Sequence, residues 1–336
     1  MTQLGEFDIN VRGAEAKEII LDPVYLDPSI IAIFDVIGDM IPKSKREMIY
    51  AGERAFGGRE SKGCGDNAPL ADTKFSPRYI ETVEYKDYDE VCKSSFDQTI
   101  LSELQRQGLN ADGYDLTDTE LMDIMTLRFR QSNIKQIKML AFFGDRDATQ
   151  AERAVVDGMF TKLLPEGVSS GTIKNYSDLS NKVLAEGEGV QMLRKVKRNA
   201  PNELVGLDNN QLVYLVDRKV YEQLEDDMID RTIGSGLGYQ LLADGRKVMM
   251  FNGIMVVPMY NWNTYAEQYL NLENPNYVIL TALRNLTIAT DKDIDTPTFE
   301  QWYDRDSQLN KTRLNMALGF NYKHDKLLSV AIPEGA

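Results

Sequence analysis

Nucleophilic hydrolysis is the first chemistry that the residue types of this chain suggest. Gly167-Val168-Ser169-Ser170-Gly171 matches the Gly-x-Ser-x-Gly pattern, and His324, the only histidine, could serve as the base for Ser169. In esterases the pattern works because a sharp turn from a strand into a helix exposes the serine hydroxyl. Here a helical pattern and Pro165 precede the motif, with no apolar strand before it. A serine hydrolase that uses Ser169 and His324 is therefore only an alternative, and we interpret His324 as a solvent-exposed turn residue.

Metal binding is the second chemistry to consider. A single histidine rules out zinc sites that are built on two histidines. Asp291, Asp293 and Asp295 resemble the start of a calcium-binding loop. Thr296 and Trp302 stand where that loop has a glycine and a bidentate glutamate, so a solvated acidic turn is favoured and a weakly held structural cation stays open. We predict no catalytic, cofactor-binding or metal-binding residues and no cofactor.

Composition limits the class of protein. The chain has 336 residues, of which 43% are hydrophobic, and a formal net charge of −14 at pH 7. This length is enough for one large or two smaller domains with a substantial core. The acidic balance disfavours a surface that grips nucleic acid by neutralising phosphates. The one concentrated basic stretch, Arg194–Arg198, is interpreted as a solvated helix end, because cations stabilise helix C-termini.

Cysteine use and hydropathy indicate a compartment. Cys64 and Cys92 do not belong to a disulfide-rich pattern, so both are predicted to be free thiols in a reducing environment. No apolar run reaches the roughly 20 residues that cross a bilayer, and the first residues show no secretory signal. We therefore expect synthesis in a cytoplasm and no membrane partner.

The elements that would position a site begin with two segments that cannot bury themselves. Residues 1–50 are predicted to be an arm, in which Asp27-Pro28 starts a short helix over Ile30–Ile37 that is apolar on nearly every side. Residues 51–80 place glycines among charged and small residues, which favours an extended loop or hairpin. This apolar helix needs a surface against which to bury its side chains, such as a neighbouring subunit.

Helical periodicity starts at Asp87. Apolar residues every four positions predict a first helix that ends near Gly108. Thr117 and Glu120 form a capping box that starts a second helix, roughly 33 Å long at ~1.5 Å per residue. Phe142-Phe143 follows as an aromatic anchor. Predicted helices cover 87–108, 117–139, 151–164, 190–198 and 218–230, and Pro165 and Gly167 are expected to end the third.

Strand signals are strongest in the second half. Asn252-Gly253 predicts a hairpin, because this pair readily takes the left-handed conformations of a two-residue turn. Side chains alternate over Thr312–Tyr322 with the period of a half-buried strand. Predicted strands cover 212–216, 248–251, 254–257, 312–322 and 327–332.

A set of segments between residues 80 and 332 carries a family resemblance through its order and spacing. The segments are Val91–Lys93, Leu116–Leu121, Ala141–Asp145, Phe251–Pro258, Leu280–Asp291, Thr312–Tyr322 and Leu327–Ile332. Together they resemble the major capsid proteins of tailed double-stranded DNA bacteriophages.

The resemblance implies an α+β, Hong Kong 97-type capsid fold in four parts. Residues 1–50 would be the N-terminal arm, and 51–85 the extended loop. Residues 86–150 and 286–336 would form the peripheral domain, with a spine helix and a long-stranded sheet. Residues 151–285 would form the axial domain.

The same resemblance implies a structural protein and not an enzyme. Copies would self-assemble as hexamers and pentamers into an icosahedral shell around double-stranded DNA, without sequence-specific contacts, and would reside in the virion after synthesis in the host cytoplasm. Portal and scaffold proteins are further expected partners, with decoration proteins as an option. An encapsulin-like nanocompartment shell is the alternative, and the arm and long glycine-rich loop favour the phage interpretation.

Overall fold

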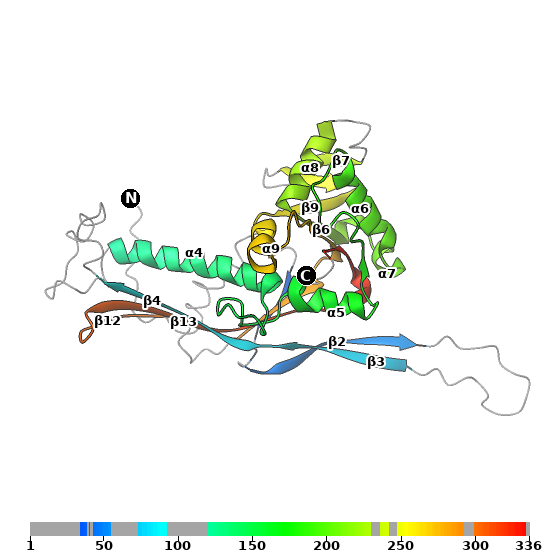
Figure 1. Ribbon diagram of the computed structural model, residues 1–336. Helices are drawn as coiled ribbons and strands as arrows, with labels where there is room; N and C mark the ends of the chain where they lie inside the picture. Colours follow the sequence, from blue (N-terminus) through cyan, green and yellow to red (C-terminus); the bar gives the residue numbers. More distant parts are fainter. Residues whose placement is uncertain are drawn as a thin grey trace, which may run out of the picture.

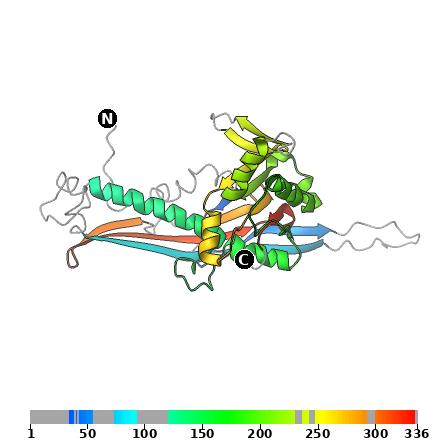
Figure 2. The ribbon, with the colours of Figure 1, turned by 45° about the horizontal axis from the view of Figure 1, so that its top comes forward.

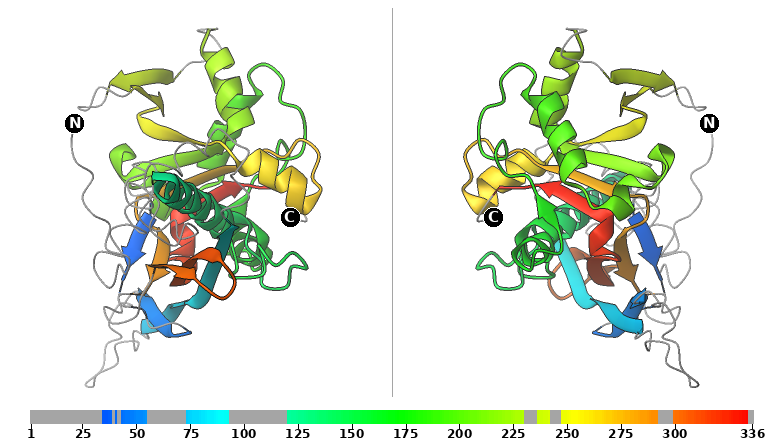
Figure 3. Two further views of the ribbon diagram at one scale, coloured as in Figure 1. Left: turned by 90° about the vertical axis from the view of Figure 1, so that its left-hand side faces the viewer. Right: turned by 90° about the vertical axis from the view of Figure 1, so that its right-hand side faces the viewer.

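Two β-sheets and one projecting hairpin organise the chain (Figure 1). The computed structural model describes residues 34–38, 40, 43–54, 73–92, 120–229, 236–241, 247–291 and 299–333. The first sheet forms a long base, and the second sheet stands over one end of it (Figure 1). Figure 3 shows both bodies from either end, with the green-to-yellow part of the second sheet above the teal and orange strands of the first.

The first sheet is built around its longest strand, β13 (Leu309–Tyr322). One edge of β13 pairs antiparallel with β4 (Val83–Cys92). The other edge pairs first with β12 (Phe299–Asp304) and then with β11 (Leu286–Thr290). β1 (Phe34–Ile37) adds a parallel edge strand beside β11. One long strand therefore ties together segments from both ends of the chain.

Helix α4 (Glu120–Phe143) runs along the first sheet (Figure 2). Tyr85 of β4 donates a hydrogen bond to Asn133 Oδ1 at 2.7 Å, and Asn133 donates to the carbonyl of Phe129 at 2.9 Å. Both side chains are buried, so this polar pair fixes the helix against the sheet. At ~1.5 Å per residue the helix is about 36 Å long.

The second sheet has the strand order β5-β14-β10-β6-β9-β8-β7 around a fully buried central strand, β6 (Leu212–Asp217). Helices α6 (Glu188–Asn199) and α8 (Arg218–Ile229) cover one face, and α9 (Trp262–Leu270) lies on the other. The remaining elements are β5 (Lys174–Asn175), β7 (Leu237–Leu241), β8 (Lys247–Phe251), β9 (Ile254–Met259), β10 (Val278–Ala282), β14 (Leu328–Ala331), η2 (Met159–Leu163), α5 (Leu164–Ser169), α7 (Asn202–Val205), η3 (Asn209–Gln211) and η4 (Asp325–Leu327).

Five buried aromatic side chains fill the junction at the end of α4: Phe142, Phe143, Phe160, Trp262 and Tyr277. The ring centroid of Phe160 lies 4.3 Å from that of Tyr277 and 4.7 Å from that of Trp262. The aromatic anchor predicted at Phe142-Phe143 is confirmed, since both rings contact this cluster.

The elements with the clearest local patterns are also confirmed. Asn252 and Gly253 take φ values of 49° and 78°, as the predicted hairpin turn requires. The long predicted helix continues past Met139 to Phe143. Predictions agree with the structure for α4, α6, α8, β6, β8, β9, β13 and β14.

The helix predicted over 30–37 is wrong where the structure describes it. Residues 34–37 form β1, in which Phe34 pairs with Leu286 and Val36 with Ile288. β-branched and aromatic residues fit a pleated surface well, and pairing with β11 outweighs the local helical pattern. Residues 30–33 lie outside the described part of the chain.

The helix predicted over 87–108 is wrong at its start. Residues up to Cys92 belong to β4, in which Tyr85 and Val91 are buried while Tyr88 and Glu90 are exposed. This alternation suits one sheet face on the core and one in solvent. Residues 93–108 lie outside the described part.

The helix predicted over 151–164 begins later than expected. Residues 151–156 form turns and a bend, and η2 is a π-turn in which the Leu163 N–H donates to the Gly158 carbonyl at 3.2 Å. Pro165 lies in the first turn of α5 and Gly167 lies within it, so neither residue ends the helix. Proline is tolerated in a first helical turn because it lacks the N–H that such a turn leaves unused.

Gly319 marks a close approach between β13 and the end of β3 (Thr73–Glu81). A Cβ at this position would lie 2.4 Å from the carbonyl oxygen of Glu81, so Gly319→Ala must displace backbone. We expect a loss of about 1–3 kcal/mol in the free energy of unfolding, measured by urea denaturation. Gly238→Ala in β7 is the matched control, since no atom lies within 4 Å of its Cβ. Equal losses in the two variants would contradict the steric explanation.

Within the described ranges, no helix is long and apolar enough to cross a bilayer. Cys92, at the end of β4, forms no disulfide bond within the described residues. Cys64 lies outside those ranges.

Candidate assembly surface

The Gly-x-Ser-x-Gly motif lies on a helix end rather than on a strand-to-helix turn. Ser169 is the last residue of α5 and is exposed. The Ser170 hydroxyl donates to the Gly167 carbonyl at 3.0 Å, and Gly167 is packed against Ile173. The sharp turn that exposes an esterase nucleophile is therefore missing at this motif.

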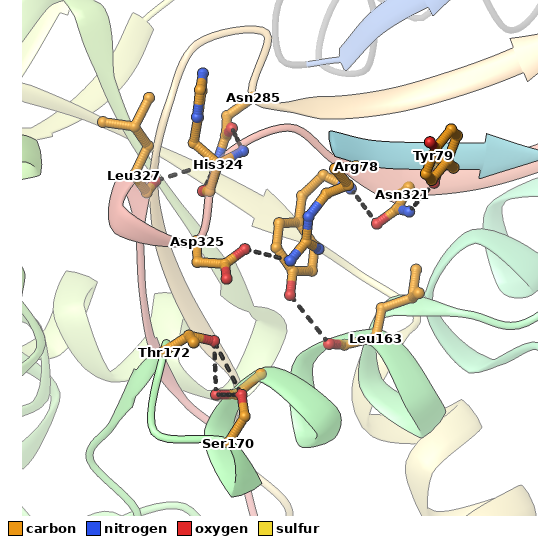
Figure 4. Close-up of polar contacts among 12 residues, drawn as sticks. Arg78, Tyr79, Leu163, Ser170, Thr172, Asn285, Asn321, His324, Asp325 and Leu327 are labelled. Atoms are coloured by element: carbon orange, nitrogen blue, oxygen red, sulfur yellow. Dashed lines mark hydrogen bonds and ion pairs between the residues drawn. The ribbon is translucent and has the colours of Figure 1, made fainter. Parts of the chain in front are cut away.

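His324 is half-buried, so its interpretation as a solvent-exposed turn residue is wrong. Burial lowers the pKa of the imidazole, and the neighbouring Asp325 only partly opposes this effect. In Figure 4 the imidazole points away from Ser170 and Thr172. The backbone N–H of His324 donates to Asn285 Oδ1 at 2.9 Å, so the residue serves to close the turn after β13. The geometry does not pair this histidine with the serine motif.

Asp291 is the one described member of the predicted acidic turn. Its buried carboxylate accepts a hydrogen bond from the Ala317 N–H at 3.2 Å, which places it inside the first sheet rather than in solvent. Asp293 and Asp295 lie outside the described residues. Across the described ranges, no three His, Cys, Asp or Glu side chains gather as a metal site.

The feature that stands apart from both bodies is the hairpin of β2 (Lys45–Arg54) and β3. Its strands pair with each other over their whole length, with one irregularity between Glu47 and Ile49. In Figures 1 and 2 the hairpin projects beyond the end of the base. Isolated two-stranded hairpins are marginally stable in water, so this one needs a further surface to pack on. The extended segment predicted over 51–80 thus forms strands at both ends, and 55–72 lie outside the described residues.

The base of the hairpin is fixed to the end of β13 by Arg78 (Figure 4). The guanidinium forms an ion pair with Asp325 and lies over the ring of Tyr322, 3.9 Å from its centroid. Asn321 adds a hydrogen bond to the carbonyl of Tyr79 at 2.7 Å. The flat face of the guanidinium stacks on the Tyr322 ring, while its N–H groups pair with the Asp325 carboxylate. These contacts anchor the base of the hairpin to the end of β13.

A cleft of about 1100 Å³ lies between the hairpin base, α5 and the turn after β13. Its walls carry charges of both signs that pair across it. Arg146 approaches Glu81 at 3.7 Å and Asp157 at 3.4 Å, and Lys326 approaches Glu203 at 3.3 Å. These exposed pairs connect the elements that form the walls of the cleft.

The solvent face of the first sheet is braced by a second set of charges. Lys311 of β13 lies 2.7 Å from Asp304 on β12 and 3.6 Å from Glu90 on β4. The hydrogen bond to Lys311 holds the pKa of Asp304 well below its usual range. Arg313 pairs with Glu300 at 2.5 Å in the same way. These cross-strand pairs tie the three long strands together on the face that lacks α4.

Comparisons with known proteins identify the fold. No family model matches the chain, and no curated protein does. Among solved structures, the capsid of Myoviridae phage XM1 matches with a TM-score of 0.56 and 9% identity, over 99% of this chain and 96% of that one. The satellite phage P4 procapsid, which includes the size determination (Sid) protein, matches at 0.55 and 12%, over 98% and 93%. The capsid of an empty GTA particle matches at 0.52 and 10%, over 98% and 94%.

These matches span nearly the whole of each chain, so they define one architecture rather than a shared fragment. The protein has the α+β Hong Kong 97-type capsid fold, as its sequence predicted.

Proposed function

We propose that this chain is the major capsid protein of a tailed double-stranded DNA bacteriophage, whose copies assemble into an icosahedral shell. The observation that carries the proposal is the projecting β2–β3 hairpin on a capsid fold. Paired strands of ten and nine residues with no core of their own gain most by lying across a neighbouring copy. Many such contacts, each modest, make a closed shell stable.

The four-part division inferred from the sequence belongs to this proposal. Residues 1–50 are the arm, 51–85 the extended loop, 86–150 with 286–336 the peripheral domain, and 151–285 the axial domain. The length of α4 and the long strands beside it support a spine for the peripheral part. The last strand, β14, pairs with β10 and so links the two domains.

The finer expectations follow from the shell. The chain is structural rather than enzymatic, and its partners are its own copies in hexamers and pentamers, together with portal, scaffold and decoration proteins. It is made in the host cytoplasm and resides in the virion. The acidic charge suits a wall that confines DNA without gripping it in a sequence-specific way.

The test is assembly of the purified protein, followed by sedimentation velocity and negative-stain electron microscopy. We expect shell-like particles from the wild type. A variant in which Asn-Gly replaces residues 52–75 keeps the pairing of Ala51 with Ser76 and shortens the hairpin. It should unfold at the wild-type urea midpoint but form no particles.

A wild type that stays monomeric under all conditions would overturn the proposal. Normal particles from the shortened variant would show that the hairpin is not the element that joins copies. Particles that hold a cargo protein and no DNA would point to the nanocompartment alternative.

A further inference from the structure

The outer ridge of α6 is basic. Its apolar residues Val190, Leu193 and Val196 are buried against the second sheet, while Arg194 and Arg198 are exposed and Lys195 is half-exposed. Positions three and four apart lie on one side of a helix, so these three cations form one ridge. In the described part of the chain, Lys195 and Arg198 have no acidic partner on their own copy.

The outer ridge of α8 is acidic. Glu222, Glu225 and Asp226 are exposed, above a buried side that includes Val220 and Leu224. Arg218 Nε forms an ion pair with Glu222 Oε1 at 2.6 Å, and Glu225 accepts a hydrogen bond from the Tyr239 hydroxyl at 3.0 Å. Asp226 has no cationic partner in the described ranges.

The order of charges along α8 opposes the helix dipole, although Arg218 and Glu222 form a stabilising i,i+4 pair. A helix favours anions near its N-terminus and cations near its C-terminus. In α8 the order is reversed, with Arg218 and Lys219 at the start and Asp226 near the end. Because acidic side chains near a helix C-terminus are unfavourable, we look for a contact outside the helix that these side chains serve.

The helices that carry the two ridges pack against each other on one face of the second sheet and extend toward its two edges. α6 packs on β10, β14 and β5, whereas α8 packs on β6, β9 and β7, toward the opposite edge of the same sheet (Figure 1). Each ridge has an exposed aliphatic side chain nearby. Val205 in α7, which follows α6, is 45% exposed, and Ile229 at the end of α8 is 83% exposed. An apolar contact beside charged groups is the usual composition of a protein–protein interface.

We propose that the basic ridge of α6 on one copy docks against the acidic ridge of α8 on the next copy. This inference rests on the proposed function and names the contact between neighbours. Copies with a net charge of −14 repel one another, and a local pair of opposite charges both offsets that repulsion and sets the orientation.

Two charge-reversal variants test the contact. The α6 reversal is Lys195→Glu with Arg198→Glu, and the α8 reversal is Glu222→Arg with Asp226→Arg. In either variant both ridges carry the same sign, so each should associate with itself roughly tenfold or more weakly than the wild type. An equimolar mixture presents opposite ridges again and should restore association. Sedimentation velocity of each variant and of the mixture measures this.

Lys86→Glu with Lys135→Glu is the matched control, because it changes the net charge as the α6 reversal does, at two exposed lysines on β4 and α4, away from both ridges. It should associate like the wild type. If the control fails as the α6 reversal does, net charge and not the ridge is responsible, and the proposal falls. It also falls if the α8 reversal associates normally or if the mixture stays dissociated.

The outcomes separate this inference from the proposed function. If the wild type forms particles but the mixture of the two reversal variants does not associate, the proposed function stands and the proposed ridge contact is wrong. Without wild-type particles, binding of the immobilised α6 reversal to the α8 reversal still tests the ridges. If only the α6 reversal has an effect, and that effect is loss of bound DNA, the basic ridge contacts phosphates instead and the proposal is overturned.

Discussion

Replacement of Phe160 by alanine is expected to lower the free energy of unfolding by about 3–5 kcal/mol. Phe160 is fully buried, and its ring contacts those of Phe143, Trp262 and Tyr277, which come from three other parts of the chain. It lies in the π-turn of η2, whose backbone is held between α4 and α5, so the neighbouring elements cannot easily collapse into the cavity. Both the lost transfer of the ring and the remaining void therefore add to the loss. Equilibrium urea denaturation at neutral pH measures it.

The control for this prediction is Tyr260→Ala. Tyr260 is also aromatic but is 64% exposed at the end of β9, so its removal should change the free energy by no more than about 0.5 kcal/mol. A loss below about 1 kcal/mol for Phe160→Ala would show that the five rings repack, and that the junction between the two sheets is not a rigid core.

Elements whose pattern is complete in the local sequence could be predicted, and those completed by a distant partner could not. In α6 the apolar residues Val190, Leu193 and Val196 already mark one helix face. β4 shows the opposite case. Its apolar positions fit a helix as well as a strand, and only the pairing with β13, more than 200 positions later, selects the strand. β1 failed for the same reason, because its partner β11 lies far along the chain.

The same distinction between local patterns and distant partners applies to the candidate assembly surface. The glycine-rich composition of residues 51–80 was enough to predict an extended segment with little to bury. The group that fixes its direction was not predictable, because Arg78 and Asp325 are 247 positions apart and neither stands in a motif. The basic stretch Arg194–Arg198 was visible in the sequence. The acidic ridge on α8 could not be related to this stretch from the sequence, because only the fold places both helices on one sheet face.

The second large effect concerns Asp217, a fully buried carboxylate at the end of β6. It accepts hydrogen bonds from the backbone N–H groups of Val220, at 2.9 Å, and of Tyr277. These donors favour the charged form, yet burial outweighs them and raises the pKa of Asp217 to about 6, from an ordinary value of 3.8. The folded state therefore binds this proton more tightly than the unfolded state does.

The sign of the pH dependence follows from this order of pKa values. The contribution of Asp217 to stability is fully present below pH 3.8 and is lost as the pH rises through about 6. A difference of about two pKa units corresponds to roughly 3 kcal/mol. The free energy of unfolding of the wild type, relative to that of Asp217→Asn, should thus fall by about that amount between pH 4 and pH 7.

Urea denaturation of both proteins across this pH range measures the change. The side-chain amide that Asp217→Asn introduces would face one backbone N–H with its own N–H₂ group, which lowers stability by a similar amount at every pH and so shifts the whole curve. The slope of the difference isolates the titration, because all other ionisable groups are common to the two proteins. Parallel curves for the two proteins would show that the carboxylate is solvated, and that the α8 N-terminus and the segment before β10 are not joined by a buried charge.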